Sequence, residues 1–251
     1  ALKRISRQSC QQERVWFVPN SFNLAEAVKN NYGKNTDAIL PVCVDRSIYH
    51  PLTKSDRSKT PRLLIVGPDV RGSETEPLTF KGMWDIREAL KILDKNNIDY
   101  KVVRISSSPM DIFSDIECEF HIAPADSDKT ILYGTSDIMI YASHYDSCPR
   151  PPMEAMASGV AVVCTDTPGA REYCVHDKNC VLVPIKSPER IADAVIRLLK
   201  DDGHRKRIIE GGLKTADQYP VQREWQTIED LLYRFFYLSQ RQVYDGHFLR
   251  N

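Results

Sequence analysis

The sequence predicts an α/β protein built on a doubly wound parallel sheet. Short apolar runs rich in β-branched residues alternate along the chain with longer segments of helical period. Strands separated by helices of this length are joined by right-handed crossovers, which give a parallel sheet covered on both faces. The chain has 251 residues, of which 42% are apolar and 27% charged, so it can form a hydrophobic core and is not intrinsically disordered.

The regular alternation begins at residue 62, after a polar and charged stretch at 52–61 that has the composition of a linker. The helix expected at its end has an apolar face made by Ile191, Ala194, Val195, Leu198 and Leu199. The expected strands are Arg62–Val66, Tyr100–Ile105, Ile138–Ala142, Ala161–Thr165 and Cys180–Val183, and the expected helices are Met83–Asn96, Asp128–Gly134, Pro151–Ala157, Ala170–Tyr173 and Pro188–Lys200.

The first 50 residues carry a strand–helix–strand piece that is too short to bury a core of its own. Val15–Val18 and Ala38–Cys43 are read as strands, and Asn23–Asn31 as a helix that follows the capping signals at Asn20 and Ser21. We therefore expect residues 1–50 to be the tail of a preceding domain, residues 51–220 to form the α/β domain, and residues 221–251 to form a carboxyl-terminal helix.

The carboxyl-terminal part is predicted to be helical from His204 to about Val243. An apolar stripe of helical period, made by Ile228, Leu231, Leu232, Phe235 and Leu238, is expected to face a core. The aromatic cluster Tyr233, Phe235, Phe236 and Tyr237 also fits an interfacial membrane belt, which is the less favoured interpretation.

Charge and composition exclude several classes of protein. The 34 basic and 34 acidic side chains cancel, which removes the general attraction to nucleic acid and argues against a polybasic membrane surface. No apolar run reaches the roughly 20 residues needed to span a bilayer, and no secretory signal is visible in the first 20 residues. We expect a cytoplasmic chain that is a fragment or a processed product, since it starts at Ala.

The cysteines and histidines are not spaced in the sequence as the ligands of a metal site would be. Seven cysteines are scattered without a Cys-x2-Cys pair, and Cys164 and Cys180 have apolar neighbours typical of core thiols, so reduced and buried cysteines are expected. The six histidines share no common helical face. No metal site is expected.

Candidate binding residues follow the predicted strands, because ligands bind at the carboxyl ends of an open parallel sheet. After Val66 come Gly67, Arg71, Lys81 and Gly82, and glycines with a lysine before a helix suit a phosphate group. The alternative is a solvated loop lysine, because the segment is neither a Walker A motif nor a Gly-x-Gly-x-x-Gly fingerprint.

Two carboxylates follow the strand Ile138–Ala142. Asp146 lies in the loop and Glu154 in the first turn of the next helix, and a carboxylate can accept both vicinal hydroxyls of a ribose or a hexose. His144 lies beside Asp146 and could contact a sugar. The turn with Gly169, after the strand Ala161–Thr165, would present backbone donors to the same cleft. The alternatives are a helix-start charge for Glu154 and a surface position for His144.

The stretch from Ser136 to Leu199, which begins SDIMIYASHYDSCPRPPMEAMASGVAVVC, resembles the nucleotide-sugar-binding half of family 4 glycosyltransferases. The segments FVPNSFNLAEAVKNNYG and AILPVCVDRSIYHP resemble the family's last amino-domain strand and helix and its interdomain crossover. The resemblance covers about residues 15–220. It implies a Rossmann-like domain of a GT-B-type enzyme, with residues 1–50 as the tail of the acceptor domain.

The resemblance also implies roles for single residues. Glu154 matches the family glutamate that holds the donor ribose, and Asp146 matches a carboxylate near the sugar ring. Lys81 matches a lysine that contacts the diphosphate, and Arg71 is the candidate for its companion arginine. The chain departs from the family at three points: Asp146 is one methylene shorter than the usual Glu, a Pro-rich tract replaces the usual glycines, and Pro68 stands where the arginine usually is.

Together these features lead to an expected function. The chain resembles the donor-binding half of a retaining, hexosyltransferase-like enzyme that transfers a sugar from a nucleoside-diphosphate donor to a glycan or lipid-linked acceptor in polysaccharide biosynthesis. The expected catalytic residues are Lys81, Asp146 and Glu154, and no metal or cofactor is expected beside the donor substrate. The fragment alone is expected to be inactive, and peripheral association with the inner face of a membrane is a further expectation.

Two alternatives remain from the residues alone. A non-catalytic α/β nucleotide-sugar-binding module or partner subunit would fit the shortened Asp146 and the lost glycines. A nicotinamide-dependent enzyme fits less well, because the glycine fingerprint is absent. Nucleic acid is not an expected partner.

Overall fold

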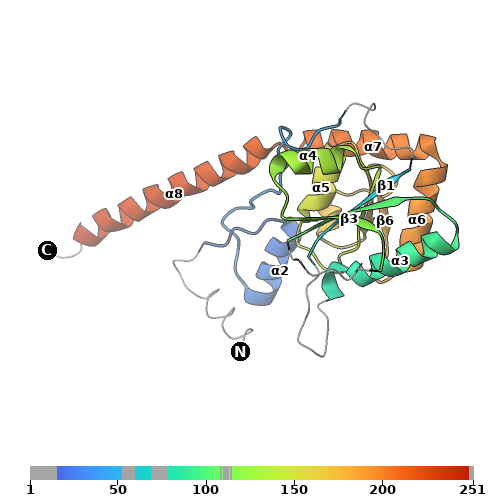
Figure 1. The fold of residues 1–251 in the computed structure, drawn as a ribbon. Helices are drawn as coiled ribbons and strands as arrows, with labels where there is room; N and C mark the ends of the chain where they lie inside the picture. The colour runs from blue at the N-terminus through green and yellow to red at the C-terminus, as the bar shows by residue number, and fades with distance from the viewer. Residues whose placement is uncertain are drawn as a thin grey trace.

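The computed structural model describes residues 16–52, 60–68, 79–107, 109, 113 and 115–248, with side chains described to residue 237. Figure 1 shows the sheet with helices around it. Six parallel strands form this sheet in the order β3-β2-β1-β4-β5-β6, which is the strand order of a Rossmann fold. The strands are β1 (Arg62–Val66), β2 (Lys101–Ser106), β3 (Cys118–Ile122), β4 (Ile138–Tyr141), β5 (Ala161–Thr165) and β6 (Val181–Val183). The predicted doubly wound parallel sheet is confirmed.

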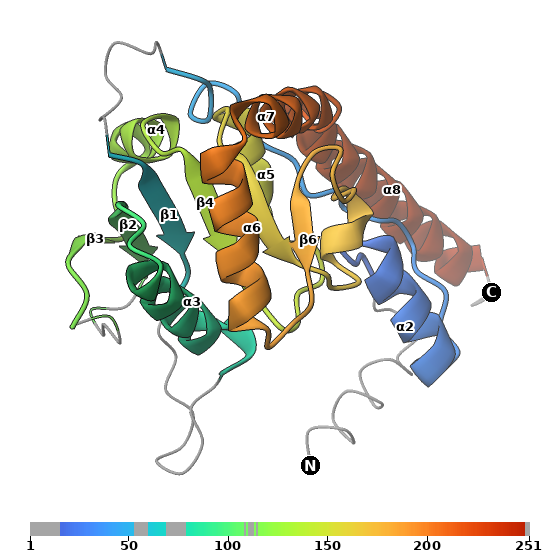
Figure 2. The ribbon, with the colours of Figure 1, turned by 90° about the vertical axis from the view of Figure 1, so that its right-hand side faces the viewer.

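Helices cover both faces of the sheet. Figure 2 shows α3 and α6 lying across one face, while α4, α5 and α7 lie on the other side. The helices are α2 (Phe22–Tyr32), α3 (Met83–Lys95), α4 (Asp126–Gly134), α5 (Arg150–Ala157), α6 (Pro188–Lys200), α7 (Asp202–Asp217) and α8 (Val221–Phe248), with 3-10 turns η2 (Thr79–Lys81) and η3 (Ala170–Glu172).

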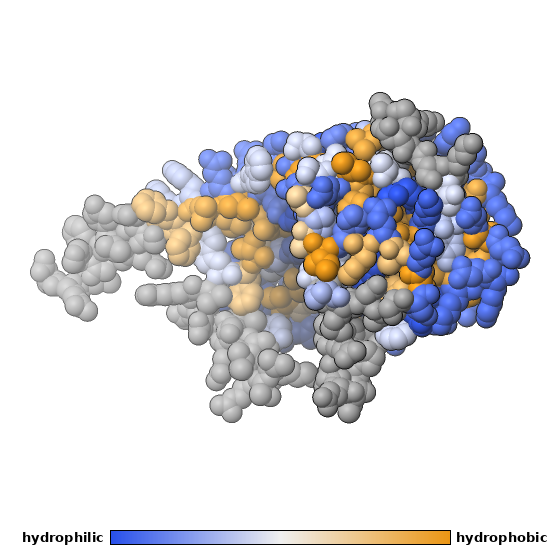
Figure 3. Space-filling model, viewed as in Figure 1, coloured by the Kyte–Doolittle hydropathy of each residue, from blue (hydrophilic) through white to orange (hydrophobic). Residues whose placement is uncertain are grey.

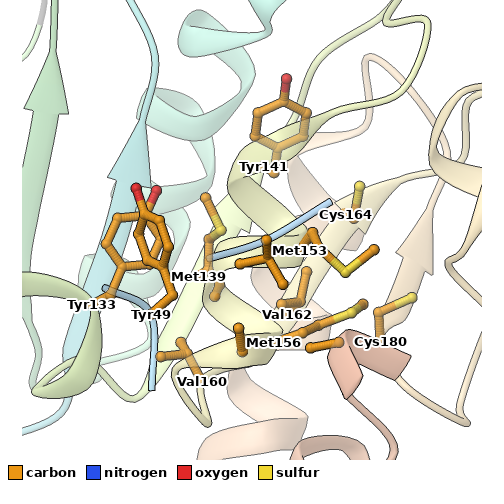
Figure 4. Close-up of a cluster of buried hydrophobic side chains, with 14 of the residues drawn as sticks. Tyr49, Tyr133, Met139, Tyr141, Met153, Met156, Val160, Val162, Cys164 and Cys180 are labelled. Atoms are coloured by element: carbon orange, nitrogen blue, oxygen red, sulfur yellow. The ribbon is translucent and has the colours of Figure 1, made fainter. Parts of the chain in front are cut away.

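Alternating strand residues build two cores. On β1, Leu63 and Ile65 face the core under α3 and α6, and Leu64 faces the core under α5. The second core is rich in tyrosine and sulfur (Figure 4). Because every residue of β4 and β5 is buried, these strands read in the sequence as continuous apolar runs, which is why they could be located.

The edge strand β3 is not among the predicted strands. Cys118–Ile122 pairs only with β2, and the strand contains Glu119 and His121 and is at most half-buried. Its sequence therefore lacks the apolar run by which the central strands are recognised.

The two strands predicted in the first 50 residues are wrong where the structure describes them. Trp16–Val18 and Ala38–Cys43 are irregular, although Val42 and Cys43 are buried. Pro41 lacks the N–H that a ladder would need. Val44, which follows the second segment, forms an isolated parallel bridge with Pro220 by donating to the Tyr219 carbonyl and accepting from the Val221 N–H.

The carboxyl-terminal helical region is two helices, α7 and α8, separated at Gln218–Pro220. The expectation that the stripe on α8 faces a core is wrong for its described side chains. Leu232 is 64% exposed and Phe235 is 56% exposed. Figure 1 shows why: α8 leaves the α/β domain, and apolar side chains gather along it in the surface view (Figure 3).

The described cysteines are free thiols, and Cys164 and Cys180 are buried in the core as predicted. Among the helices of the described chain, none is long and apolar enough to cross a membrane.

Candidate functional site

A pocket of about 480 Å³ opens at the carboxyl ends of the strands. Its walls come from the segments that follow β1, β2, β3 and β4, and it includes the point between β1 and β4 where the strand order reverses. Ligands bind at this point in open α/β sheets. The lining residues are Asn20, Val66, Gly67, Pro68, Lys81, Ile105, Ser106, Ser107, Ala123, Pro124, Lys129, Tyr141, Asp146, Cys148, Pro149, Arg150 and Pro151.

Lys81 and Asp146 meet in this pocket. The Lys81 Nζ lies 2.9 Å from Asp146 Oδ2, and the same oxygen accepts a hydrogen bond of 2.6 Å from the Tyr141 hydroxyl. Both charged side chains are mostly buried, with 27% of Lys81 and 17% of Asp146 exposed. The structure therefore holds a cation and an anion in fixed positions at the mouth of the sheet.

The backbone around Gly82 sets the position of Lys81. Gly82 has a φ of +66° and precedes α3, and a Cβ there would lie 1.8 Å from the carbonyl oxygen of Ala142. The His144 N–H donates to the Phe80 carbonyl at 2.6 Å, which joins the loop after β4 to the turn that carries Lys81. Only glycine fits this close approach, so the two loops pack together.

His144 does not line the pocket. Its Nε2 lies 2.5 Å from Asp85 Oδ2 in the first turn of α3, and both side chains are largely buried. The structure thus places His144 beside the site, where its ring links the β4–α5 loop to α3 through Asp85.

Glu154 lies one turn further along α5 than the pocket residues Arg150 and Pro151, and it does not line the pocket. Its Oε2 accepts a 2.6 Å hydrogen bond from the Tyr133 hydroxyl, and Tyr49 donates a second one. The two tyrosine rings pack edge to face with centroids 5.0 Å apart, and Figure 4 shows their hydroxyls side by side.

Burial raises the pKa of Glu154 above its ordinary value, and the two tyrosine hydrogen bonds oppose that rise. The pKa of Tyr133 lies well above its ordinary value because the ring is buried next to the carboxylate. This environment is not that of an exposed helix-start glutamate.

Two of the other predicted residues are glycines with close neighbours. Gly67 lines the pocket, and its N–H donates to the Ile105 carbonyl at 3.0 Å. Gly169 packs on the loop after β4, since a Cβ would lie 2.1 Å from the Asp146 carbonyl oxygen. Gly169 thus supports the loop without lining the pocket. Arg71 lies outside the described residues.

Five polar residues that line the pocket are not among the predicted site residues: Asn20, Ser106, Ser107, Lys129 and Arg150. Lys129 lies on α4 after the unpredicted β3, so nothing in the sequence placed it at the same edge. Arg150 lies between Asp146 and Glu154 in the sequence, and this position is the signal by which it could have been predicted as a site residue. With Lys81, Lys129 and Arg150 against Asp146, the charges of the pocket favour an anionic ligand.

Metal ligands are not grouped in the part of the chain that the structure describes: no three His, Cys, Asp or Glu side chains there are placed to hold an ion.

Known proteins share this architecture. One match is Anabaena Alr3699/HepE, which was solved in complex with UDP-glucose. The two folds agree with a TM-score of 0.75 and 16% sequence identity, and the match covers 92% of this chain and 67% of that chain. The fold of this chain also matches the carboxyl-terminal domain of LpcC, a glycosyl transferase group 1 family protein from Francisella tularensis, with a TM-score of 0.58 and 26% identity over 71% of this chain and 99% of that domain. The fold is therefore that of GT-B glycosyltransferases.

The sequence agrees with the fold. Residues 115–215 match the family described as glycosyl transferases group 1. A D-inositol 3-phosphate glycosyltransferase from Xylanimonas cellulosilytica is 37% identical over 87 residues, which are 35% of this chain and 21% of that relative. The chain thus matches only about a fifth of the length of this curated relative.

Proposed function

We propose that this chain is the donor-binding half of a retaining glycosyltransferase. The enzyme transfers a sugar from a nucleoside diphosphate to a glycan or lipid-linked acceptor. One observation carries the proposal: Lys81 and Asp146, 65 residues apart, form an ion pair in a pocket at the switch point of the sheet. That HepE is solved with UDP-glucose in the same fold adds support for this class of donor.

Lys81 acts on the leaving group. As the bond between sugar and diphosphate breaks, negative charge grows on the phosphate oxygens, and a fixed ammonium stabilises it without reorganisation. The pocket's excess of cations serves the same purpose. No metal ion is needed for this step.

Asp146 is proposed to accept hydrogen bonds from the donor sugar. The Tyr141 hydroxyl and Lys81 both hold Oδ2, so the carboxylate is oriented before the donor arrives. Its second oxygen can accept a sugar hydroxyl.

Glu154 is proposed to hold the ribose hydroxyls. Tyr133 and Tyr49 fix the carboxylate, and Glu154 lies one helical turn along α5 from the pocket residues Arg150 and Pro151. Tyr49 belongs to the segment AILPVCVDRSIYHP, which resembles the interdomain crossover of the family. The proposed ribose site therefore uses residues from this segment and from the stretch between Ser136 and Leu199.

A second candidate is a non-catalytic module that binds the donor and transfers nothing. The prolines of the loop after β4 favour it, because they stand where the family has glycines. Sugar transfer or donor hydrolysis by the full-length parent distinguishes the enzyme from the module.

A thermal-shift screen tests the proposal. Nucleoside diphosphate sugars based on uridine, guanosine and adenosine are compared with the matched nucleosides. A ligand present at about 100 times its dissociation constant adds roughly 2.7 kcal/mol of stability. The proposal predicts stabilisation by at least one diphosphate sugar and little by its nucleoside. Equal shifts for both members of every pair, or none at all, would contradict it.

A further inference from the structure

The amino terminus of α5 has lost most of its backbone donors. A helix normally offers four free N–H groups at its start, and these groups are available to bind an anion. Here the cap residue is Pro149 and the second and third helical residues are Pro151 and Pro152, none of which has an N–H. Only Arg150 retains one. This terminus faces the pocket, since Pro149, Arg150 and Pro151 line it.

The Arg150 side chain lies at the same place. It lines the pocket and is 50% exposed, and its guanidinium donates to Glu224 Oε1 at 2.5 Å and to the Cys43 carbonyl at 3.4 Å. Glu224 belongs to the first turn of α8, and Cys43 precedes the bridge between Val44 and Pro220. Arg150 therefore lies between the pocket and the two segments that carry Cys43 and Glu224.

The pairing of Arg150 with Glu224 is one-sided. Only one carboxylate oxygen accepts from the guanidinium, whereas a bidentate pair would engage both. The other oxygen, Oε2, is buried and has no hydrogen-bond partner in the described structure. Glu224 is 13% exposed, so its charge is poorly solvated and incompletely satisfied. Such a pair is open to competition from a better anion.

We propose that Arg150 is a further ligand of the donor's phosphate groups, and that Glu224 competes with those groups for its guanidinium. This inference rests on the proposed function. The side chain replaces the backbone donors that the prolines remove, and a diphosphate offers several oxygens in place of one. Glu154 also faces Arg150 electrostatically, so it too influences the charge at this point.

Titration calorimetry with UDP, GDP and ADP, and with the matched nucleosides, tests the inference. Arg150→Gln is expected to weaken diphosphate binding about tenfold, because a charged hydrogen bond is lost. Glu224→Gln is expected to tighten it about threefold to tenfold, because the competing charge is removed. Arg150→Gln/Glu224→Gln should bind like Arg150→Gln, and Arg150→Lys should recover part of the affinity. Nucleoside affinity should not change.

Asp217→Asn is the matched control for Glu224→Gln. Asp217 pairs at 3.6 Å with Arg46, and neither residue lines the pocket, so this variant removes one negative charge from another arginine pair. It should leave diphosphate affinity within about twofold of the wild type. Melting temperatures for all variants show whether each protein is folded.

The outcomes separate the two claims. If the wild type binds no nucleoside diphosphate, the proposed function fails and this inference fails with it. If the wild type binds, but Glu224→Gln binds no tighter than Asp217→Asn or Arg150→Gln stays within twofold of the wild type, the inference alone is overturned. Arg150 and Glu224 would then form a purely structural pair.

Discussion

At the scale of single residues, Glu154 shows how much the fold changes an ordinary side chain. From the sequence, a glutamate in the first turn of a helix is adequately explained by the helix dipole. In the structure, its carboxylate is partly buried and accepts from Tyr133 and Tyr49. Ionising this carboxylate in the folded protein therefore costs more free energy than ionising the carboxylate of an exposed glutamate.

This environment predicts a pH dependence of stability. The pKa of Glu154 in the folded protein is raised above the unfolded value of 4.5, so the folded state holds the proton more tightly. The resulting stabilisation is fully present below the unfolded pKa and is lost as the pH rises through the folded pKa. Glu154→Gln should lack this loss. The free energy of unfolding, measured for both proteins from pH 4 upward by denaturant titration, should show the wild type falling relative to the variant. Parallel curves would refute the shift.

The proposed ribose contact gives a second residue-scale prediction. Glu154→Ala should weaken nucleoside diphosphate binding by about a hundredfold or more, because two hydrogen bonds to a charged acceptor are lost, each worth roughly 1.5–3 kcal/mol. Calorimetry decides the matter. A change of less than threefold would leave Glu154 with only its structural contacts to the tyrosines.

The sequence could place these residues only in part. Lys81 and Asp146 are expected at the same edge, because each follows a strand of a parallel sheet, and the 2.9 Å contact confirms that they meet. Tyr141 as the partner of Asp146 could not be foreseen, since a tyrosine at the end of a buried strand reads as a core residue. The partners of Glu154 come from two distant segments, and no local pattern joins them.

At the scale of elements, the turn from η2 into α3 and the loop after β4 form one unit. Gly82 adopts a left-handed conformation against the Ala142 carbonyl, and the Phe80 carbonyl accepts from both Ser143 and His144. This packing fixes Lys81 relative to Asp146. Helix termini and loops that pack so closely leave little freedom for a larger side chain.

Gly82→Ala tests the role of this packing, with Gly33→Ala as the matched control. Both glycines have almost the same φ, +66° and +67°, but nothing lies within 4 Å of a Cβ at Gly33. The strained φ should cost both variants about 1–2 kcal/mol. Gly82→Ala should lose roughly 1–3 kcal/mol more, because its Cβ meets backbone atoms. Equal unfolding free energies for the two variants would show that the loops are not tightly packed.

Central strands are predictable at this scale because burial on both faces makes them continuous apolar runs, as in β4 and β5. The same rule fails twice. It misses β3, an edge strand containing charged residues. It also predicts a strand at Ala38–Cys43, which is an irregular segment with Val42 and Cys43 buried. Apolar character indicates burial, but the hydrogen-bond partners of the backbone decide whether a strand forms.

At the scale of the whole molecule, the described cations that suit a donor's phosphates, Lys81, Lys129 and Arg150, line one pocket on one α/β domain. We propose that the acceptor is held by a facing amino-terminal domain. The exposure of α8, whose apolar stripe is expected from the sequence to be buried, could not be predicted from its helical period. A period shows which side chains share a face, and it does not show whether anything covers that face.

This arrangement predicts that the 251-residue chain binds a nucleoside diphosphate sugar but transfers no sugar. Without an acceptor held in place, the reaction loses positioning that can supply roughly 7–11 kcal/mol of the barrier. Product formation is measured for this chain and for a longer version that includes the facing domain. Comparable turnover by the short chain would show that it holds both substrates.

Calorimetric titration of the chain and of Lys81→Ala, with a nucleoside diphosphate and with the matching nucleoside, tests most directly whether this pocket binds the donor. The Lys81 ammonium lies in the pocket beside Asp146 and is proposed to contact only phosphate oxygens. We expect the variant to lose about tenfold or more in affinity for the diphosphate, because a charged hydrogen bond is lost, and to keep its affinity for the nucleoside. Equal affinities of the two proteins for the diphosphate would contradict the assignment of this pocket to the donor.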